Sequence, residues 1–290
     1  MKRNLFLLSL ITLLSLGGIA GCATSGKTLI TVCASELPHA KILNEVIKGV
    51  VKEDGYDLQV TVLDWTLQND AVANGEYDAN YFEHVPYLKT YEGKTPLYAA
   101  CKVHYEKLCV YASDKSKKTI ENGSAIELVD DVSNVERALQ LLASGNYLTI
   151  NPDNYDAKGA FTNFDTTHPN NGVTWKTGFE NCRLTCIKES QLCQSLPDYD
   201  FAIIPGNTAL TGLGEDYASR IVFGENPSDA LLSAKANIIT VKKENKDDDK
   251  TAELVKAFAD ERVASYIATT FGESVIYHYE NGLKTDFLAA

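Results

Sequence analysis

Apolar residues in the first part of the chain change between two spacings, and this alternation limits the fold more than any other feature. Residues 29–33 and 58–63 read as strands, whereas residues 39–55 repeat their apolar side chains at helical spacing. A second, shorter helix is expected over 67–74, ended by Gly75. Strand-helix-strand alternation of this kind predicts an α/β fold with sheets flanked by helices.

The remainder of the chain continues in the same manner. Further strands are expected at 103–111, 126–129, 184–187, 201–204 and 237–241. Helices are expected over 134–142 and 191–196, and one long amphipathic helix over 251–271. Ser133 or Asn134 would cap the first of these helices. The stretch 151–172 reads as a loop.

The N-terminus has the form of a lipoprotein signal. A basic start is followed by an apolar run from Leu5 to Leu16 and by Ile19-Ala20-Gly21-Cys22. The run is too short to span a membrane. We therefore expect residues 1–21 to be a signal peptide and the mature chain to be anchored by lipid on Cys22 at the extracytoplasmic face of the cell membrane. An ordinary signal with Cys22 as a bystander is the alternative.

The charge balance excludes one class of partner. Without residues 1–21 the chain has 25 Lys and Arg against 39 Asp and Glu, a net charge of −14. Nucleic acids are bound through clustered basic side chains, so a nucleic-acid partner is not expected. About 270 residues suffice for one large or two medium domains.

Beyond Cys22 the chain has six cysteines, namely Cys33, Cys101, Cys109, Cys182, Cys186 and Cys193. Outside the cytoplasm they could form up to three disulfides in any of fifteen pairings, or they could be buried free thiols. A zinc site at Cys182, Cys186 and Cys193 would lack a CxxC pair and an evident fourth ligand. We therefore expect neither a metal nor a cofactor.

Catalytic motifs are not evident. The sequence has no GxSxG elbow, no HExxH and no Gly-rich phosphate loop. A Cys–His hydrolase stays open because its partners need not be neighbours in sequence. We expect a binding protein rather than an enzyme.

Two groups of residues suggest a binding site. Phe82, His84 and Tyr87 lie in a predicted strand-to-helix turn, where open α/β sheets bind ligands, although they could equally be core residues. Arg137 near a helix start could hold a carboxylate, or could pair with Glu136 or Asp131 at the surface. Asn207 and Asn237 at strand edges could bind polar groups or form turns. Together they suggest a cleft for an amino acid.

These residues occur in a pattern that resembles a known family, the NlpA lipoprotein family of methionine-binding lipoproteins of ABC importers. The matching segments are Pro38-His39-Ala40, Asp78-Ala79-Asn80 with Phe82 and His84, Pro86-Tyr87-Leu88, Ser133-Asn134 with Arg137-Ala138-Leu139, and Asn237 with its strand. The resemblance covers essentially all of the mature sequence.

The resemblance implies a two-lobed periplasmic-binding-protein (type II) fold, each lobe a mixed sheet flanked by helices. We expect residues 22–28 to form a tether, 29–111 with 230–290 the first lobe, and 112–229 the second. By resemblance, a monomer binds L-methionine between the lobes and delivers it to a permease with its ATPase. Trp65, Phe82 and Tyr87 with His84 would then hold the side chain, Arg137 the carboxylate and Asn237 the amino-acid backbone.

The chain departs from the family at two points. A family Asn falls on Pro205, where Asn207 is the nearest side-chain amide, and a family Gly falls on Leu37. A methionine derivative, another apolar amino acid or a short peptide is therefore an alternative ligand. A surface adhesin or antigen on the same fold, without a transport role, is the alternative of a different class.

Overall fold

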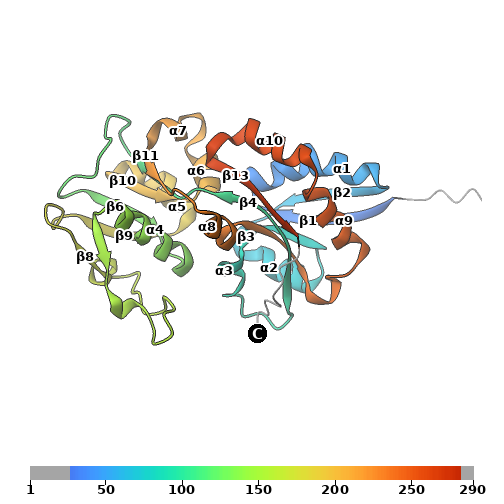
Figure 1. The fold of residues 1–290 in the computed structure, drawn as a ribbon, viewed down its shortest axis with the longest axis horizontal. Helices are drawn as coiled ribbons and strands as arrows, with labels where there is room; N and C mark the ends of the chain where they lie inside the picture. The colour runs from blue at the N-terminus through green and yellow to red at the C-terminus, as the bar shows by residue number, and fades with distance from the viewer. Residues whose placement is uncertain (1–26, 282–290) are drawn as a thin grey trace, which may run out of the picture.

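The computed structural model describes residues 27–281, except the side chains of residues 215 and 273. The signal peptide, Cys22 and most of the tether lie outside the described residues. The chain forms two lobes joined side by side, each built on one sheet (Figure 1). This confirms the predicted α/β architecture of two mixed sheets flanked by helices.

The first sheet has six strands in the order β13-β4-β12-β3-β1-β2. Its strands are β1 (Thr28–Ala34), β2 (Tyr56–Val62), β3 (Ala79–His84), β4 (Leu97–Glu106), β12 (Asn237–Lys242) and β13 (Val275–Asn281). Strands β1, β2 and β3 pair in parallel, whereas β12 pairs antiparallel with β3 and β4. The sheet is therefore mixed, and its central strands are almost wholly buried.

Helices flank this sheet. They are η1 (Glu36–Ala40), η2 (Leu43–Ile47), α1 (Lys48–Glu53), α2 (Trp65–Asn74), α3 (Val85–Leu88), α8 (Asp229–Lys235), α9 (Asp249–Phe258) and α10 (Glu261–Phe271). Gly75, with a φ of 79°, ends α2 in the left-handed conformation that glycine adopts without strain. The core on one face packs the η1–α1 segment, α9 and α10 against the strands.

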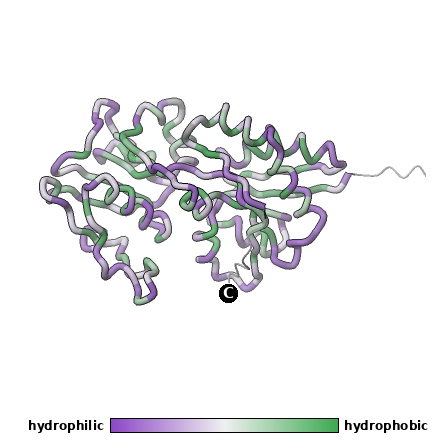
Figure 2. The backbone as a smooth tube through the Cα atoms, viewed as in Figure 1, coloured by the Kyte–Doolittle hydropathy of each residue, from purple (hydrophilic) through white to green (hydrophobic). Residues whose placement is uncertain are grey.

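The second sheet has five strands in the order β11-β5-β10-β6-β9. They are β5 (Cys109–Ala112), β6 (Ala125–Val129), β9 (Arg183–Ile187), β10 (Phe201–Ile204) and β11 (Ile221–Gly224). Its helices are α4 (Val132–Ser144), α5 (Glu189–Ser195), α6 (Gly206–Gly212) and α7 (Tyr217–Arg220). A separate hairpin of β7 (Leu148–Ile150) and β8 (Val173–Trp175) extends this lobe. Figure 2 shows the hydrophobic segments concentrated along the strands of both lobes.

Short turns complete the connections: η3 (Pro152–Asn154), η4 (Pro169–Gly172), η5 (Leu196–Asp198), η6 (Gly214–Asp216), η7 (Lys243–Asn245) and η8 (Gly272–Ser274). The chain leaves the first sheet after Glu106 and enters the second at Cys109, and it returns between Gly224 and Asn237. The two lobes are thus connected twice. The expected lobe boundaries near 111 and 230 stay a prediction.

Candidate functional site

A cleft between the lobes encloses about 560 Å³ of space, including its open mouth. Trp65, Phe82, His84 and Tyr87 line the cleft from the first lobe, together with Asn237. Arg137 and Asn207 line it from the second lobe. The fold therefore brings the predicted site residues together in one place, and their roles in binding stay a prediction.

Three aromatic side chains form one wall of the cleft. The Tyr87 ring lies between the other two, with centroid distances of 5.5 Å to Trp65 and 5.8 Å to Phe82, both edge-on. Trp65 is the first residue of α2, which Asp64 caps by accepting from the Thr66 amide at 2.9 Å. Edge-on aromatic pairs hold one another in fixed orientation. The wall is thus apolar and preorganised.

His84 joins this wall as a neutral imidazole. It is the N-cap of α3, where Nδ1 accepts a hydrogen bond from the Tyr87 amide at 3.2 Å. Burial lowers the pKa of His84 to about 3, and the nearby charges of Lys235 and Arg137 act in the same direction. With Nδ1 used as an acceptor, Nε2 carries the proton. His84 therefore offers the cleft an uncharged ring.

Arg137 lies in α4, which begins two residues earlier than expected. The N-cap is Asp131, whose carboxylate accepts from the Asn134 amide at 3.0 Å, so the predicted caps Ser133 and Asn134 are wrong. Asp131 has the extended backbone conformation that a helix N-cap requires. This start directs Arg137 inward, where it is only 6 % exposed.

The partner of Arg137 is Glu225, just after β11. Arg137 donates from Nε and Nη2 to the two carboxylate oxygens, each at 2.6 Å, and from Nη2 to the Glu106 carbonyl at 2.5 Å. The alternative surface pairing with Glu136 or Asp131 is therefore wrong. Burial alone would lower the pKa of Arg137, but the Glu225 carboxylate raises it. Among the described residues Nη1 has no acceptor, so it is the nitrogen available to a ligand.

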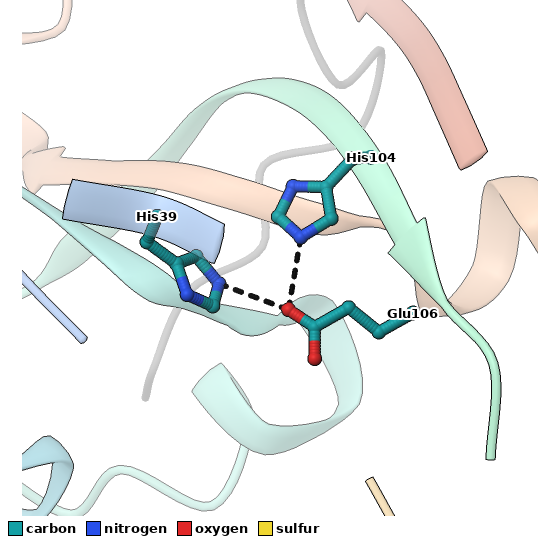
Figure 3. Close-up of side chains that lie close together, drawn as sticks. All are labelled: His39, His104 and Glu106. Atoms are coloured by element: carbon teal, nitrogen blue, oxygen red, sulfur yellow. Dashed lines mark hydrogen bonds and ion pairs between the residues drawn. The ribbon is translucent and has the colours of Figure 1, made fainter. Parts of the chain in front are cut away.

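His39, His104 and Glu106 form a hydrogen-bonded hub at the base of the cleft. Figure 3 shows both rings directed at the same carboxylate oxygen, with Nε2 of His104 at 2.9 Å and Nε2 of His39 at 3.2 Å. The other oxygen of Glu106 accepts from the Asn207 amide at 3.0 Å. The hub therefore ties the first lobe to the start of α6 in the second.

Burial determines which groups of the hub carry charge. Burial raises the pKa of Tyr81 far above its usual range, so its hydroxyl, which is hydrogen-bonded to Nδ1 of His104, stays protonated. Burial also raises the pKa of Glu106. Burial lowers the pKa of His39 to about 4 and that of His104 to about 3, so both rings are neutral. His39 also contacts the side-chain oxygen of Asn237 at 3.0 Å. That oxygen is thus already used, and Asn237 presents its N–H groups.

The hub is also where a metal could be held. Its three ligand atoms lie within 4.8 Å of one another, and among residues 27–281 no other group of His, Cys, Asp and Glu meets this condition. The suggested zinc site at Cys182, Cys186 and Cys193 is therefore not formed. All six described cysteines are free thiols, so disulfides between them are not formed either.

Four residues of the site were not singled out from the sequence: Glu106, Asn134, Glu189 and Glu225. Asn134 stood in the family pattern, and its buried side-chain oxygen has no hydrogen-bond partner among the described residues. Glu189 and Glu106 line the cleft. Pro205 lines it as well and precedes α6 as its N-cap. Glu225 has no local sequence signal because its partner lies 88 residues away.

None of the helices in residues 27–281 has the length and apolar character required to cross a membrane. Lipidation of Cys22 falls outside the described residues and stays a prediction.

The chain is similar to several known lipoproteins. It is 38 % identical over 158 residues to the methionine-binding lipoprotein MetQ of Bacillus subtilis, an alignment that covers 51 % of this chain and 57 % of that protein. A lipoprotein structure from Ruminococcus gnavus matches with a TM-score of 0.74 and 31 % identity, over 87 % of this chain and 99 % of that one.

A nutrient-binding protein from Burkholderia cenocepacia, solved with methionine bound, has the same fold. It matches with a TM-score of 0.73 and 24 % identity, over 86 % of this chain and 99 % of that one. The model of the NlpA lipoprotein family matches residues 30–278. This match spans both sheets and the cleft between them, and the chain therefore belongs to the NlpA lipoprotein family.

Proposed function

We propose that the chain captures L-methionine, or a close derivative, in the cleft between its lobes and delivers it to an ABC permease with its ATPase. The observation that carries this proposal is the pairing of an aromatic wall with polar donors across one cleft. Trp65, Phe82 and Tyr87 face a space also lined by Arg137 and Asn237. A thioether against aromatic rings gains about 0.3–1.5 kcal/mol per contact.

The donors suit the carboxylate end of an amino acid. Arg137 has Nη1 available, and Asn237 presents N–H groups because His39 already contacts its oxygen. A neutral His84 in the wall adds no charge where an apolar side chain would lie. The name of the Bacillus subtilis relative supports methionine as the ligand. The lipid anchor on Cys22 would keep the protein at the extracytoplasmic face of the cell membrane.

Tryptophan fluorescence provides a direct test. The chain has two tryptophans, and only Trp65 is in the cleft, whereas Trp175 lies in the hairpin of the second lobe. In the Trp175→Phe variant of the full-length chain, refolded to remove carried-over ligand, L-methionine is expected to change the emission of Trp65 in a saturable manner. The matched Trp65→Phe variant keeps Trp175 and should not respond.

A melting experiment identifies the ligand. A compound at a hundred times its dissociation constant should stabilise the protein by about 2.7 kcal/mol. Stabilisation by L-methionine supports the proposal. If another apolar amino acid or a methionine-containing dipeptide stabilises the protein and L-methionine does not, the specificity differs, as Pro205 in the cleft would allow. If no amino acid or dipeptide acts, the transport proposal is wrong.

A further inference from the structure

Most acceptors in the cleft are already used by the protein. Four carboxylates line it, and in three of them each oxygen already accepts a hydrogen bond within the fold. Glu83 accepts from Asn69 at 3.1 Å on one oxygen and from Thr240 at 3.0 Å on the other. Both oxygens of Asp131 accept from Asn134, one from the backbone amide and one from the side chain, each at 3.0 Å.

Glu106 and Asn237 are committed as well. The carboxylate of Glu106 receives His104 on one oxygen and the Asn207 amide on the other. The side-chain oxygen of Asn237 contacts His39. A ligand ammonium group needs acceptors, and each of these oxygens already accepts a hydrogen bond from the protein.

Glu189 is different. It is the first residue of α5 and lines the cleft with Pro205. Its Oε1 accepts from the Thr208 hydroxyl, whereas its Oε2 has no donor among the described residues. Among the described residues it is therefore the one carboxylate of the lining with an oxygen that accepts no hydrogen bond from the protein.

We propose that Glu189 binds the ammonium group of the ligand through Oε2, and so replaces the amide that Pro205 cannot supply. This inference rests on the proposed function, because it concerns an amino-acid ligand. Arg137 and Asn237 supply donors for the carboxylate, and Glu189 supplies the acceptor that completes the recognition of a zwitterion. The chain thereby selects compounds that carry a free amine.

The surroundings of Glu189 make this binding depend on pH. Burial raises the pKa of Glu189 to about 7; Thr208 opposes the shift, and the charges of Asp131, Glu106 and Asp130 add to it. The Tyr87 hydroxyl across the cleft and the Cys193 thiol in α5 also interact with this charge. Below pH 7 the Glu189 carboxyl of the ligand-free protein is mostly protonated, and an uncharged carboxyl no longer attracts an ammonium group. Affinity is therefore expected to fall as the pH decreases from 8 to 6.

Calorimetry on the full-length chain tests the proposal with two ligands, L-methionine and its deamino analogue 4-(methylthio)butanoate. The wild type should bind L-methionine at least about tenfold more tightly than the analogue. Glu189→Gln should lose about tenfold or more in affinity for L-methionine, little for the analogue, and its affinity should vary less between pH 6 and 8. Glu45→Gln, an exposed carboxylate outside the cleft, is the matched control and should behave as the wild type.

The outcomes separate this inference from the proposed function. If the wild type binds no amino acid, both are wrong. If Glu189→Gln melts as the wild type and binds L-methionine with unchanged affinity, only the role of Glu189 is wrong. If the variant does not fold, the affinities of the wild type still test the inference. Equal affinities for L-methionine and its deamino analogue would overturn it.

Discussion

The guanidinium group of Arg137 is bonded within the second lobe, and Arg137 also lines the cleft. Its Nε and Nη2 are bonded to Glu225, which also accepts from the Leu108 amide at 2.9 Å and from the Tyr105 hydroxyl. Both charged side chains are almost fully buried, at 6 % and 7 % exposure. Breaking a buried ion pair leaves an uncompensated charge in a medium that solvates it poorly. Arg137 therefore supports the second lobe, in addition to the role in ligand binding proposed for it.

Arg137→Ala should lower the free energy of unfolding by about 3–5 kcal/mol, since Glu225 would remain buried without its partner. Urea unfolding followed by circular dichroism measures this loss. Adding Glu225→Gln should restore part of it, because the amide oxygen still accepts from Leu108. Arg262→Ala removes an exposed pair with Glu53 and should cost far less. Equal losses for the two arginine variants would contradict the buried-pair interpretation.

The residues of the site were predictable where a local pattern marks them. Phe82, His84 and Tyr87 lie within one strand-to-helix turn, so their common direction follows from the backbone alone. The partners that tune the site could not be found in this way. Glu225 bonds Arg137 across 88 residues of sequence, and Glu106 bonds Asn207 across 101, so neither contact leaves a spacing signature.

The sequence pattern also failed to predict the elements near the C-terminus correctly. The predicted helix 251–271 is two helices, α9 and α10. The chain breaks between them because the backbone of Asp260 is extended and its side chain caps α10, accepting a hydrogen bond from the Arg262 backbone amide at 2.9 Å. Apolar residues continue at helical spacing across the break, so periodicity hides it. Strand β13 was not predicted, because its pairing with β4 depends on a distant segment. The strands on either side of the expected loop 151–172, β7 and β8, pair with each other, and neither strand was predicted.

Two aspartates at helix starts allow a controlled test of this break. Asp260→Ala removes a cap with a side-chain hydrogen bond and should destabilise the protein by about 1 kcal/mol, seen as a lower melting temperature. Asp248→Ala is the matched control, since Asp248 is the N-cap of α9 but makes no side-chain cap bond. Its effect should be smaller. Ligand affinity should not change in either variant, because neither residue lines the cleft.

Six thiols are distributed over both lobes without forming a disulfide among the described residues. From the sequence, both disulfides and buried free thiols were possible for an even number of cysteines. Only the tertiary structure distinguishes these two alternatives. Burial raises the pKa of Cys33 and Cys186 to about 12 and that of Cys109 and Cys193 to about 11. Since the thiolate is the reactive form, these groups are protected in the folded protein.

A thiol reagent such as 5,5′-dithiobis(2-nitrobenzoate) should therefore react slowly with the native protein at pH 8 and rapidly in urea. The absorbance of the released thionitrobenzoate measures both rates. The low thiolate fraction and the poor access act in the same direction for the buried thiols, so we expect the largest difference for Cys33, Cys101 and Cys109 and a smaller one for the half-buried Cys186 and Cys193. Rapid reaction of any of Cys33, Cys101 or Cys109 in native buffer would contradict their burial.

The two connections between the lobes also determine how the molecule responds to a force applied at its ends. β1 and β13 belong to the same sheet, so both ends of the described chain emerge from the first lobe, and the second lobe is an insertion in it. A force applied between residues 28 and 281 passes through the first sheet alone. The second lobe bears no tension until that sheet opens, so in a pulling experiment it is expected to rupture second, however weak it is.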